Sequence, residues 1–352
     1  MSEDEDTDVS SPHPRETTAW FGHAAAERTL IEAYRSDRMP HAWLIGGPQG
    51  IGKATLAYRT ARFVLANPDR SAASVRTAAT LALPAGHRIA RLVAAQGHPD
   101  LLVLERRPND EGKIPAVITV EAASKLVPFL GSTPREGGWR VVIVDAADEL
   151  HPAVANKMLK LVEEPPPRSL ILIVSHAPGR LLATIRSRCR RLLLRPLAPE
   201  DVARAVAAAL GETTDAAAVQ QAAAAAEGSV ARAIALLGGP LLSVRARVIE
   251  LLDRLPTTDP RALHALGESL ERADRIVVTT FLDAVRDWLS ARLVRALSEP
   301  ASAGQGRGGT LARLAKAWED INTAARDAEM YNLERKPLVF KVFGWLAEAA
   351  RG

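Results

Sequence analysis

The segment that most constrains the fold is a short apolar run followed by a glycine-rich loop and a helical pattern. The run Ala42–Ile45 leads into Gly47-Pro48-Gln49-Gly50-Ile51-Gly52-Lys53, spaced as G-x-x-x-x-G-K, and the helical pattern Ala54–Val64 follows. Glycines allow the tight curl that turns backbone N–H groups toward a phosphate, and the following helix begins with its positive end there. The pattern predicts a P-loop whose candidate nucleotide-binding residues are Gly47, Gly50, Gly52 and Lys53. The alternative is a glycine-rich turn without a ligand.

Apolar, largely β-branched runs alternate with helical patterns as far as residue 195, which is typical of a parallel sheet covered by helices. The predicted strands are Ala42–Ile45, Leu101–Leu104, Arg140–Val144, Leu170–Val174 and Arg191–Leu194. After Pro196 only helical periodicity remains, with predicted helices over Pro199–Leu210, Ala216–Glu227 and Ser229–Leu237. The later sequence is also helical, apart from a predicted loop over Ser298–Gly309. Residues 67–86 are rich in Ala and Arg and predict an inserted helix or loop.

A chain of 352 residues is too long for one ordinary hydrophobic core, so several domains are expected. We predict a disordered acidic tail over residues 1–18 and an α/β P-loop domain over residues 19–195. A small helical domain follows over residues 196–239, and a second helical domain occupies residues 240–352.

Composition indicates a soluble cytoplasmic protein and gives only a weak indication of an acidic partner. No apolar run approaches the roughly 20 residues of a membrane span, and the start has no basic segment followed by an apolar one. A single cysteine, Cys189, excludes an intrachain disulfide and a cysteine-based zinc module, and His87 and His98 lack ligand-like spacing, so no metal site is expected. The pI near 9.4 hints at nucleic acid, although a bias toward arginine in the genome explains it equally well.

The residues that would let a P-loop hydrolyse ATP are incomplete. Ala54 stands where a hydroxyl should bind Mg²⁺, and Thr55 lies about 100° further round the helix, so it should not replace that ligand directly. Asp145 ends the run Val141–Val144, as a Mg²⁺-organising carboxylate would, but Ala146 follows where a catalytic base is expected. We interpret Asp148 and Glu149 as helix-entry or solvated acids. Thr55 and Asp145 remain nucleotide-site candidates, and Mg²⁺ binding is doubtful.

Three downstream segments, in order, resemble the clamp loader subunits of bacterial DNA polymerase III. They are Ala155-Asn156-Lys157-Met158-Leu159-Lys160-Leu161-Val162-Glu163-Glu164-Pro165-Pro166, Leu182-Ala183-Thr184-Ile185-Arg186-Ser187-Arg188-Cys189 and Gly228-Ser229-Val230-Ala231-Arg232-Ala233. The combination of a degraded ATP site with an intact S-R-C motif is similar to the delta-prime branch of that family. The segment Asn332–Val339 also resembles the end of those chains. Many relatives carry four zinc-binding cysteines after the P-loop helix, whereas this chain has none there, so no zinc is expected.

The resemblance implies an α/β P-loop AAA+ domain, a small helical lid domain and a C-terminal all-helical collar domain that joins subunits into a ring. It makes Arg188 an arginine finger supplied in trans, because a guanidinium can stabilise charge developing on a neighbour's γ-phosphate. It places Ser175 at the sensor 1 position and Arg232 at the sensor 2 position. The alternatives are a solvated basic face for Arg188, a strand cap for Ser175 and an exposed helical side chain for Arg232.

The implied function is that of a delta-prime-type subunit in ATP-dependent loading of the sliding clamp onto primed DNA. The chain would not be catalytic alone, although it would form part of the DNA polymerase holoenzyme; it could bind ATP without hydrolysing it. Its implied partners are the ATPase motor subunits, a delta-type subunit, the clamp through the complex, and DNA contacted without sequence preference. Two rivals remain: an active ATPase motor subunit of the same loader, and a P-loop scaffold outside replication.

Overall fold

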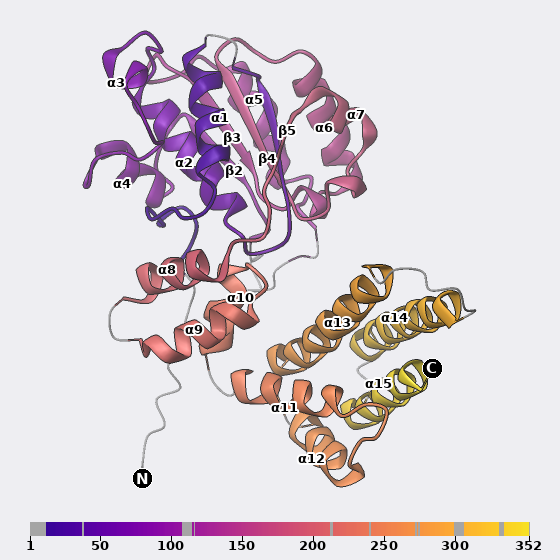
Figure 1. Ribbon diagram of the computed structural model, residues 1–352. Coiled ribbons are helices and arrows are strands. Elements are labelled where there is room, and N and C mark those ends of the chain that lie inside the picture. Colours follow the sequence, from indigo (N-terminus) through magenta and orange to yellow (C-terminus); the bar gives the residue numbers. More distant parts are fainter. Residues whose placement is uncertain are drawn as a thin grey trace, which may run out of the picture. The chain divides into compact units, whose positions relative to one another are not determined.

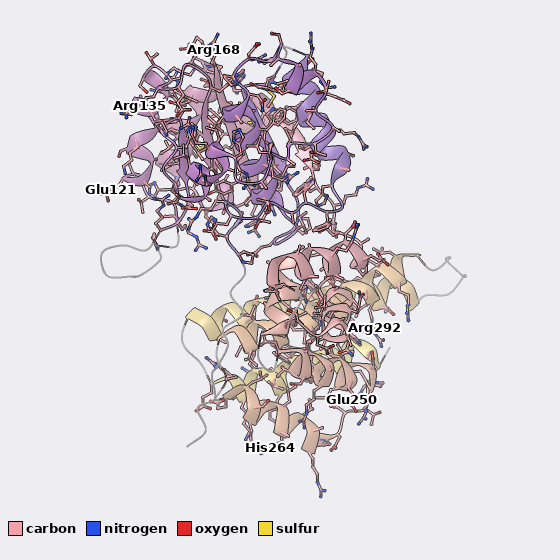
Figure 2. The ribbon with its side chains drawn as sticks, turned by 90° about the vertical axis from the view of Figure 1, so that its left-hand side faces the viewer. Glu121, Arg135, Arg168, Glu250, His264 and Arg292 are labelled. Carbon is pink, nitrogen blue, oxygen red and sulfur yellow. The ribbon has the colours of Figure 1, made fainter. Side chains whose placement is uncertain are left out.

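The chain divides into two compact units in a computed structural model: Val9–Ala235 forms one, and Leu236–Gly352 belongs to the other. The structure describes residues 12–36, 39–107, 115, 117–211, 214–238, 241–271, 273, 275–298, 306–330 and 334–351. Figure 2 shows labelled charged side chains on both units, among them Arg135 and Arg168 on the first and Glu250 and Arg292 on the second. All four are exposed.

The first unit is built on a parallel sheet of five strands in the order β2-β3-β4-β1-β5 (Figure 1). The strands are β1 (Ala42–Gly46), β2 (Leu101–Leu104), β3 (Arg140–Val144), β4 (Ser169–Ser175) and β5 (Arg190–Leu193). The five predicted strands are confirmed to within one residue at either end. Because all strands run the same way, the loops that follow them meet at one edge of the sheet.

Helices cover both faces of this sheet, which is why the strands are apolar along their whole length. One face carries α1 (Ala24–Arg35), α2 (Lys53–Ala66), α3 (Ala73–Arg76) and α4 (Arg88–Ala94), and the other carries α5 (Leu126–Gly131), α6 (Pro152–Glu163) and α7 (Ala183–Arg188). Alternate strand residues belong to opposite cores: Val141 and Ile143 pack on the first face, and Val142 and Val144 pack on the second. Short 3-10 turns lie at Ala122–Lys125 (η1), Ala147–Glu149 (η2) and Pro178–Arg180 (η3).

Part of the predicted disordered tail is ordered. Arg62 donates to the carbonyl oxygens of Arg15 and Thr17 at 3.1 and 2.7 Å, and the His13 ring meets Tyr58 edge to face at 6.0 Å between ring centroids. The predicted boundary at residue 18 is therefore too late, because arginines of α2 satisfy backbone carbonyls of this segment. Residues 1–11 of the tail lie outside the described part of the chain.

The insert over residues 67–86 contains one short helix, α3, and is held to the domain by polar contacts. Glu27 accepts from the backbone N–H of Leu81 and from Arg59, both at 2.8 Å. Arg35 donates to the carbonyl oxygens of Val75 and Ala78 at 3.2 and 2.7 Å. These contacts tie the insert to α1 and, through Glu27, to α2.

Three helices follow the sheet: α8 (Pro199–Leu210), α9 (Ala216–Ala225) and α10 (Val230–Leu237), the last of which extends two residues past the boundary of the first unit. They match the predicted lid helices to within two residues. Gly228, with φ +80°, turns the chain between α9 and α10, and a Cβ there would lie 2.4 Å from the backbone nitrogen of Leu197. Glycine is therefore required at this turn.

In the part of the second unit that the structure describes, every regular element is a helix, in agreement with the helical periodicity of the sequence. The unit contains α11 (Leu241–Asp253), α12 (Pro260–Glu271), α13 (Arg275–Ser298), α14 (Gly306–Met330) and α15 (Arg335–Ala350). Its core includes Phe281, Leu289, Ile321 and Phe343. Of the predicted loop Ser298–Gly309, Gly306–Gly309 belong to α14, whose later residues pack on α13 and α15; residues 299–305 are not described. None of the helices in the described part of the chain is long and apolar enough to cross a membrane.

Candidate functional site

The glycine-rich segment adopts the geometry of a phosphate-binding loop. It joins β1 to α2 and contains three left-handed residues: Gly47 at φ +145°, Gly50 at +76° and Gly52 at +97°. Residues that have a side chain rarely adopt such φ values, which explains why glycine occupies all three positions. The helix begins at Lys53, so its first N–H groups face the loop.

Lys53 is buried within this loop, with 3% of its surface exposed. Its Nζ donates to the carbonyl oxygen of Pro48. Burial lowers the pKa of Lys53 to about 8, although the carboxylates of Asp145 and Asp148 act in the opposite direction. The ammonium group is therefore enclosed by the glycine-rich loop and bonded to its backbone.

The loop fits a phosphate better than a metal ion. Ala54 offers only a methyl group, and Thr55 is half-buried one helical position further on. Within the described residues, no group of three or more His, Cys, Asp or Glu side chains could hold a metal ion. The residues present would hold phosphate oxygens through Lys53 and the loop amides, with no hydroxyl at residue 54 for Mg²⁺.

Asp145 follows β3 at the same edge of the sheet, and Ala146 follows it. Burial raises the pKa of Asp145 to about 6, helped by Glu105 and opposed by Lys53. Ala146 has φ +60°, an unusual conformation for a residue with a side chain. The structure thus brings Asp145 into the electrostatic range of Lys53, while the position expected to carry a base carries a methyl group.

Ser175, the sensor 1 candidate, is fully buried at the end of β4. Its hydroxyl donates to Asp148 Oδ1 at 2.7 Å, and the N–H groups of His176 and Ala177 donate to the same carboxylate. Asp148 does lie in the first turn of η2, as the helix-entry interpretation expected, and its side chain in addition fixes the end of β4. No local pattern pointed to this role, since 27 residues separate Asp148 from Ser175.

The sensor 2 candidate lies on α10, whose first turn contacts the P-loop. The backbone N–H groups of Val230 and Ala231 donate to the Gly50 carbonyl oxygen at 2.9 and 3.4 Å. Arg232 pairs with Glu227 at 3.5 Å. The lid therefore contacts the loop through its backbone, and the Arg232 guanidinium lies beside a carboxylate of its own domain.

Two aromatic residues that lie near the P-loop have no signal in the sequence. His23 Nε2 lies 3.0 Å from the carbonyl oxygen of Ile51. Trp20 lies so close to Gly52 that a Cβ there would be 3.3 Å from its ring, and the Arg59 guanidinium stacks 5.7 Å from the Trp20 ring centroid. Both residues precede α1 and pack against the loop. Neither belongs to a recognisable motif.

Arg188 ends α7 and is 40% exposed. Its Nη2 lies 2.8 Å from Glu163 Oε1, and its Nη1 donates to the Thr184 carbonyl oxygen at 3.1 Å. The neighbouring Cys189 is buried, and burial raises the pKa of its thiol to about 11, as suits a structural cysteine.

Strand register places Arg188 away from the chain's own P-loop. Arg190 pairs with Trp43 near the start of β1, whereas Gly47 follows the end of β1. Trp43 and Gly47 are four residues apart along the strand direction, which corresponds to about 13 Å. Arg188 therefore lies at the opposite edge of the sheet from Lys53.

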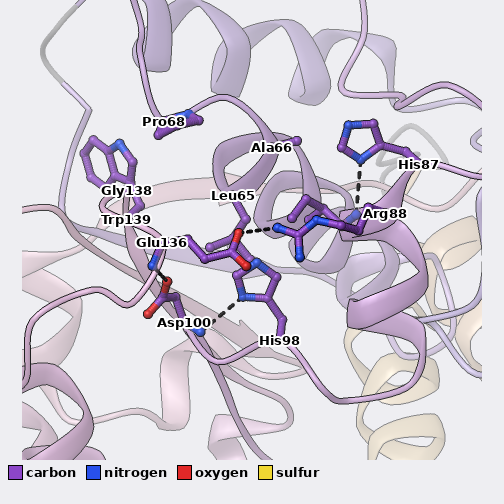
Figure 3. Close-up of a pocket in the computed structure, with 11 residues that line it drawn as sticks. Leu65, Ala66, Pro68, His87, Arg88, His98, Asp100, Glu136, Gly138 and Trp139 are labelled. Carbon is purple, nitrogen blue, oxygen red and sulfur yellow. Dashed lines mark hydrogen bonds and ion pairs between the residues drawn. The ribbon is translucent and has the colours of Figure 1, made fainter.

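A cavity of about 330 Å³ opens elsewhere in the first unit, near the starts of β2 and β3 (Figure 3). His87 caps α4 by accepting from the Ile89 N–H, and His98 accepts from the Asp100 N–H. Arg88 pairs with Glu136 at 2.6 Å. Both histidines thus act on nearby backbone, and the cavity is separate from the P-loop.

The parallel sheet, the P-loop after β1, the carboxylate after β3 and the lid on the loop together define a P-loop protein of the AAA+ class. A family model described as "DNA polymerase III, delta subunit" matches residues 22–198, which is half of the chain. The chain belongs to this family, and the resemblance to delta-prime subunits is confirmed.

Two curated relatives agree with this assignment. The DNA polymerase III subunit delta-prime of Pseudomonas aeruginosa is 37% identical over 149 residues, covering 42% of this chain and 41% of the relative. The corresponding subunit of Escherichia coli K12 is 34% identical over 168 residues, covering 47% and 46%. The chain thus spans less than half the length of the curated relatives it matches. A DNA polymerase III gamma subunit-related structure from Thermotoga maritima superposes with a TM-score of 0.38 at 15% identity, covering 92% of this chain and 99% of the other.

Proposed function

We propose that this protein is a delta-prime-type subunit of the DNA polymerase III clamp loader, which presents Arg188 to the ATP site of an adjoining subunit. The observation that carries the proposal is the exposed Arg188 at the edge of the sheet opposite Lys53. A guanidinium so far from its own P-loop would act on a nucleotide held by another chain. An arginine supplied in this way contributes about 10³ to 10⁵ in rate.

The same proposal makes the chain's own P-loop inactive in hydrolysis. Ala54 supplies no metal-binding hydroxyl, and Ala146 supplies no base. ATP binding without turnover is compatible with the glycine curl and with Lys53, which would exchange the Pro48 carbonyl for phosphate oxygens. Titration calorimetry of ATP against the isolated chain, with and without Mg²⁺, measures this binding.

The proposed partners follow from the family assignment and from the helical regions. Residues 196–239 would be the lid, and residues 240–352 would be the collar that joins the motor subunits and a delta-type subunit into a ring. The complex would open the sliding clamp and place it on primed DNA. The basic residues Lys157 and Lys160 are exposed on α6 and would face the duplex backbone.

The decisive experiment compares the DNA-stimulated ATPase of the assembled loader with wild-type, Arg188→Ala and Arg190→Ala subunits. Arg190 is also exposed and lies only two residues away, so it is a matched control. Arg188→Ala should leave the ring assembled and reduce turnover at least about tenfold, whereas Arg190→Ala should stay near the wild-type rate. Unchanged turnover with Arg188→Ala would remove the finger assignment.

Two further outcomes would favour the rivals. ATP hydrolysis by the purified chain, abolished by Lys53→Ala, would identify a motor subunit. Failure of the chain to co-purify with clamp loader subunits would favour a P-loop scaffold outside replication.

A further inference from the structure

The C-terminal ends of α6 and α7 meet through one ion pair. Arg188 Nη2 contacts Glu163 Oε1 at 2.8 Å, and Arg188 Nη1 returns to the Thr184 carbonyl oxygen at 3.1 Å. Two edges of the guanidinium are therefore bonded to this chain. With 40% of the side chain exposed, donors remain for a ligand outside it.

The backbones that carry this pair are fixed by the core. Val162, immediately before Glu163, and Cys189, immediately after Arg188, belong to the same buried cluster, together with Ile185. His41 Nε2 lies 2.8 Å from the Val162 carbonyl oxygen, which secures the last turn of α6. Core packing thus fixes the backbone at Glu163 and Arg188, so the geometry of the pair depends mainly on the rotamers of the two side chains.

A carboxylate is unfavourable where Glu163 stands. The last turn of a helix carries partial negative charge, so basic side chains are preferred there and acidic ones are disfavoured. Glu164 departs from the helical conformation, as a residue before proline should, and Pro165 prevents the helix from continuing. Glu163 therefore breaks a local rule at a helix end, and its contact with Arg188 offsets that cost.

We propose that Glu163 is a positioning residue for Arg188, and this inference rests on the proposed function of Arg188 as a finger. An arginine side chain has many rotamers, and ordering it at the moment of reaction is costly. Glu163 and the Thr184 carbonyl restrict those rotamers beforehand and leave the exposed donors free for the γ-phosphate of the adjoining subunit. Such preorganisation raises the rate without changing how well the nucleotide binds.

The test uses four variants of the subunit in the assembled loader: Glu163→Ala, Glu163→Gln, Glu164→Ala and Arg188→Ala. Glu163→Ala should lower kcat of the DNA-stimulated ATPase about three- to fivefold and leave KM for ATP unchanged. Glu163→Gln keeps an acceptor oxygen at the same place and should restore at least half of the loss. Glu164→Ala removes the next carboxylate, which is also exposed at this helix end, and should match the wild type.

The double variant Glu163→Ala with Arg188→Ala decides whether Glu163 acts through Arg188. It should be no slower than Arg188→Ala alone, because residues that act as a unit are not additive. A further drop would indicate a general structural role and overturn the proposal. A faster Glu163→Ala enzyme would mean that Glu163 restrains the finger, which also overturns it.

The two proposals can fail separately. A slow Arg188→Ala loader with a wild-type Glu163→Ala rate would reject only the positioning role. A wild-type rate for Arg188→Ala would reject the finger and the positioning role together.

Discussion

The backbone N–H of Val230 donates to the carbonyl oxygen of Gly50 over 2.9 Å, so the lid helix α10 begins directly on the P-loop. Ser229 also lies close to the loop, because a Cβ on Gly50 would be 2.2 Å from its hydroxyl oxygen. The lid and the loop therefore fit only if residue 50 has no side chain.

Gly50→Ala should destabilise the first unit by about 2–4 kcal/mol, from the cost of an alanine at φ +76° plus the clash with Ser229. Gly86→Ala is the matched control, since Gly86 has φ +73° and open space around it. The control should lose about 1–2 kcal/mol. Urea denaturation measures both changes, and equal losses would contradict the lid contact.

Lys53 should make the unfolding free energy depend on alkaline pH. Burial lowers its folded-state pKa to about 8, below the ordinary 10.5, so the unfolded chain binds more protons between these values. The contribution of Lys53 to stability therefore increases as pH rises through this window and is lost as pH falls through about 8. Lys53→Met should abolish that slope. The difference in unfolding free energy between the wild type and Lys53→Met is measured from pH 7.5 to pH 9.5. Taking this difference separates the contribution of Lys53 from that of the tyrosines. A difference that does not change with pH would contradict the burial of a charged Lys53.

Removing the charge of Asp148 should lower the stability of the fold at pH 7, whereas removing the charge of Asp145 should leave it unchanged or raise it. Burial acts to raise the pKa of Asp148, but bonds from Ser175, His176 and Ala177 lower it below its usual value overall. Asp148→Asn should therefore cost about 1–3 kcal/mol at pH 7. The pKa of Asp145 is raised to about 6, so its charge is unfavourable at that pH, and Asp145→Asn should be neutral or stabilising. Thermal unfolding at pH 7 tests the contrast, which equal losses would contradict.

Glu27→Gln should loosen the insert over residues 67–86. Glu27 and Arg59 form a buried pair at 2.8 Å, each side chain 6% exposed, and Glu27 also accepts from the Leu81 N–H. Removing one partner of a buried pair costs about 3–5 kcal/mol. Hydrogen exchange should increase in the insert before the rest of the unit. Glu16→Gln, in the more exposed pair with Arg15, should change exchange very little; similar exchange in both variants would argue against an anchoring role for Glu27.

Lys157→Ala with Lys160→Ala should weaken the complex's affinity for primed DNA and reduce its salt dependence. Each lost phosphate contact lowers the slope of log K against log salt by about 0.9, so the pair should lower it by about 1.8. Lys316→Ala removes an equally charged residue that is 76% exposed on α14 and serves as the control. Fluorescence anisotropy over a salt series gives the slopes. An unchanged slope would mean that Lys157 and Lys160 of α6 do not contact the DNA.

Much of the first unit could be predicted because local patterns agree with its architecture. A buried parallel strand must be apolar along its length, so the five runs locate the sheet. The curl before Lys53 requires residues that accept positive φ, so the glycine spacing predicts the loop. The polar part of the site was harder to predict. Asp148, Trp20 and His23 reach the site from other segments, and nothing in their neighbours along the chain marks the contacts.

The sequence alone determined that Lys53 begins a helix after a glycine curl, that Ala54 and Ala146 stand at catalytic positions, and that Arg188 lies in the S-R-C segment. These features follow from residue type and spacing alone, through backbone sterics and side-chain chemistry. Only the tertiary structure decided that Arg188 lies across the sheet from Lys53 and that Glu163 holds its guanidinium. Strand order, register and core packing bring together residues 25 positions apart, and no short-range pattern along the chain encodes that distance.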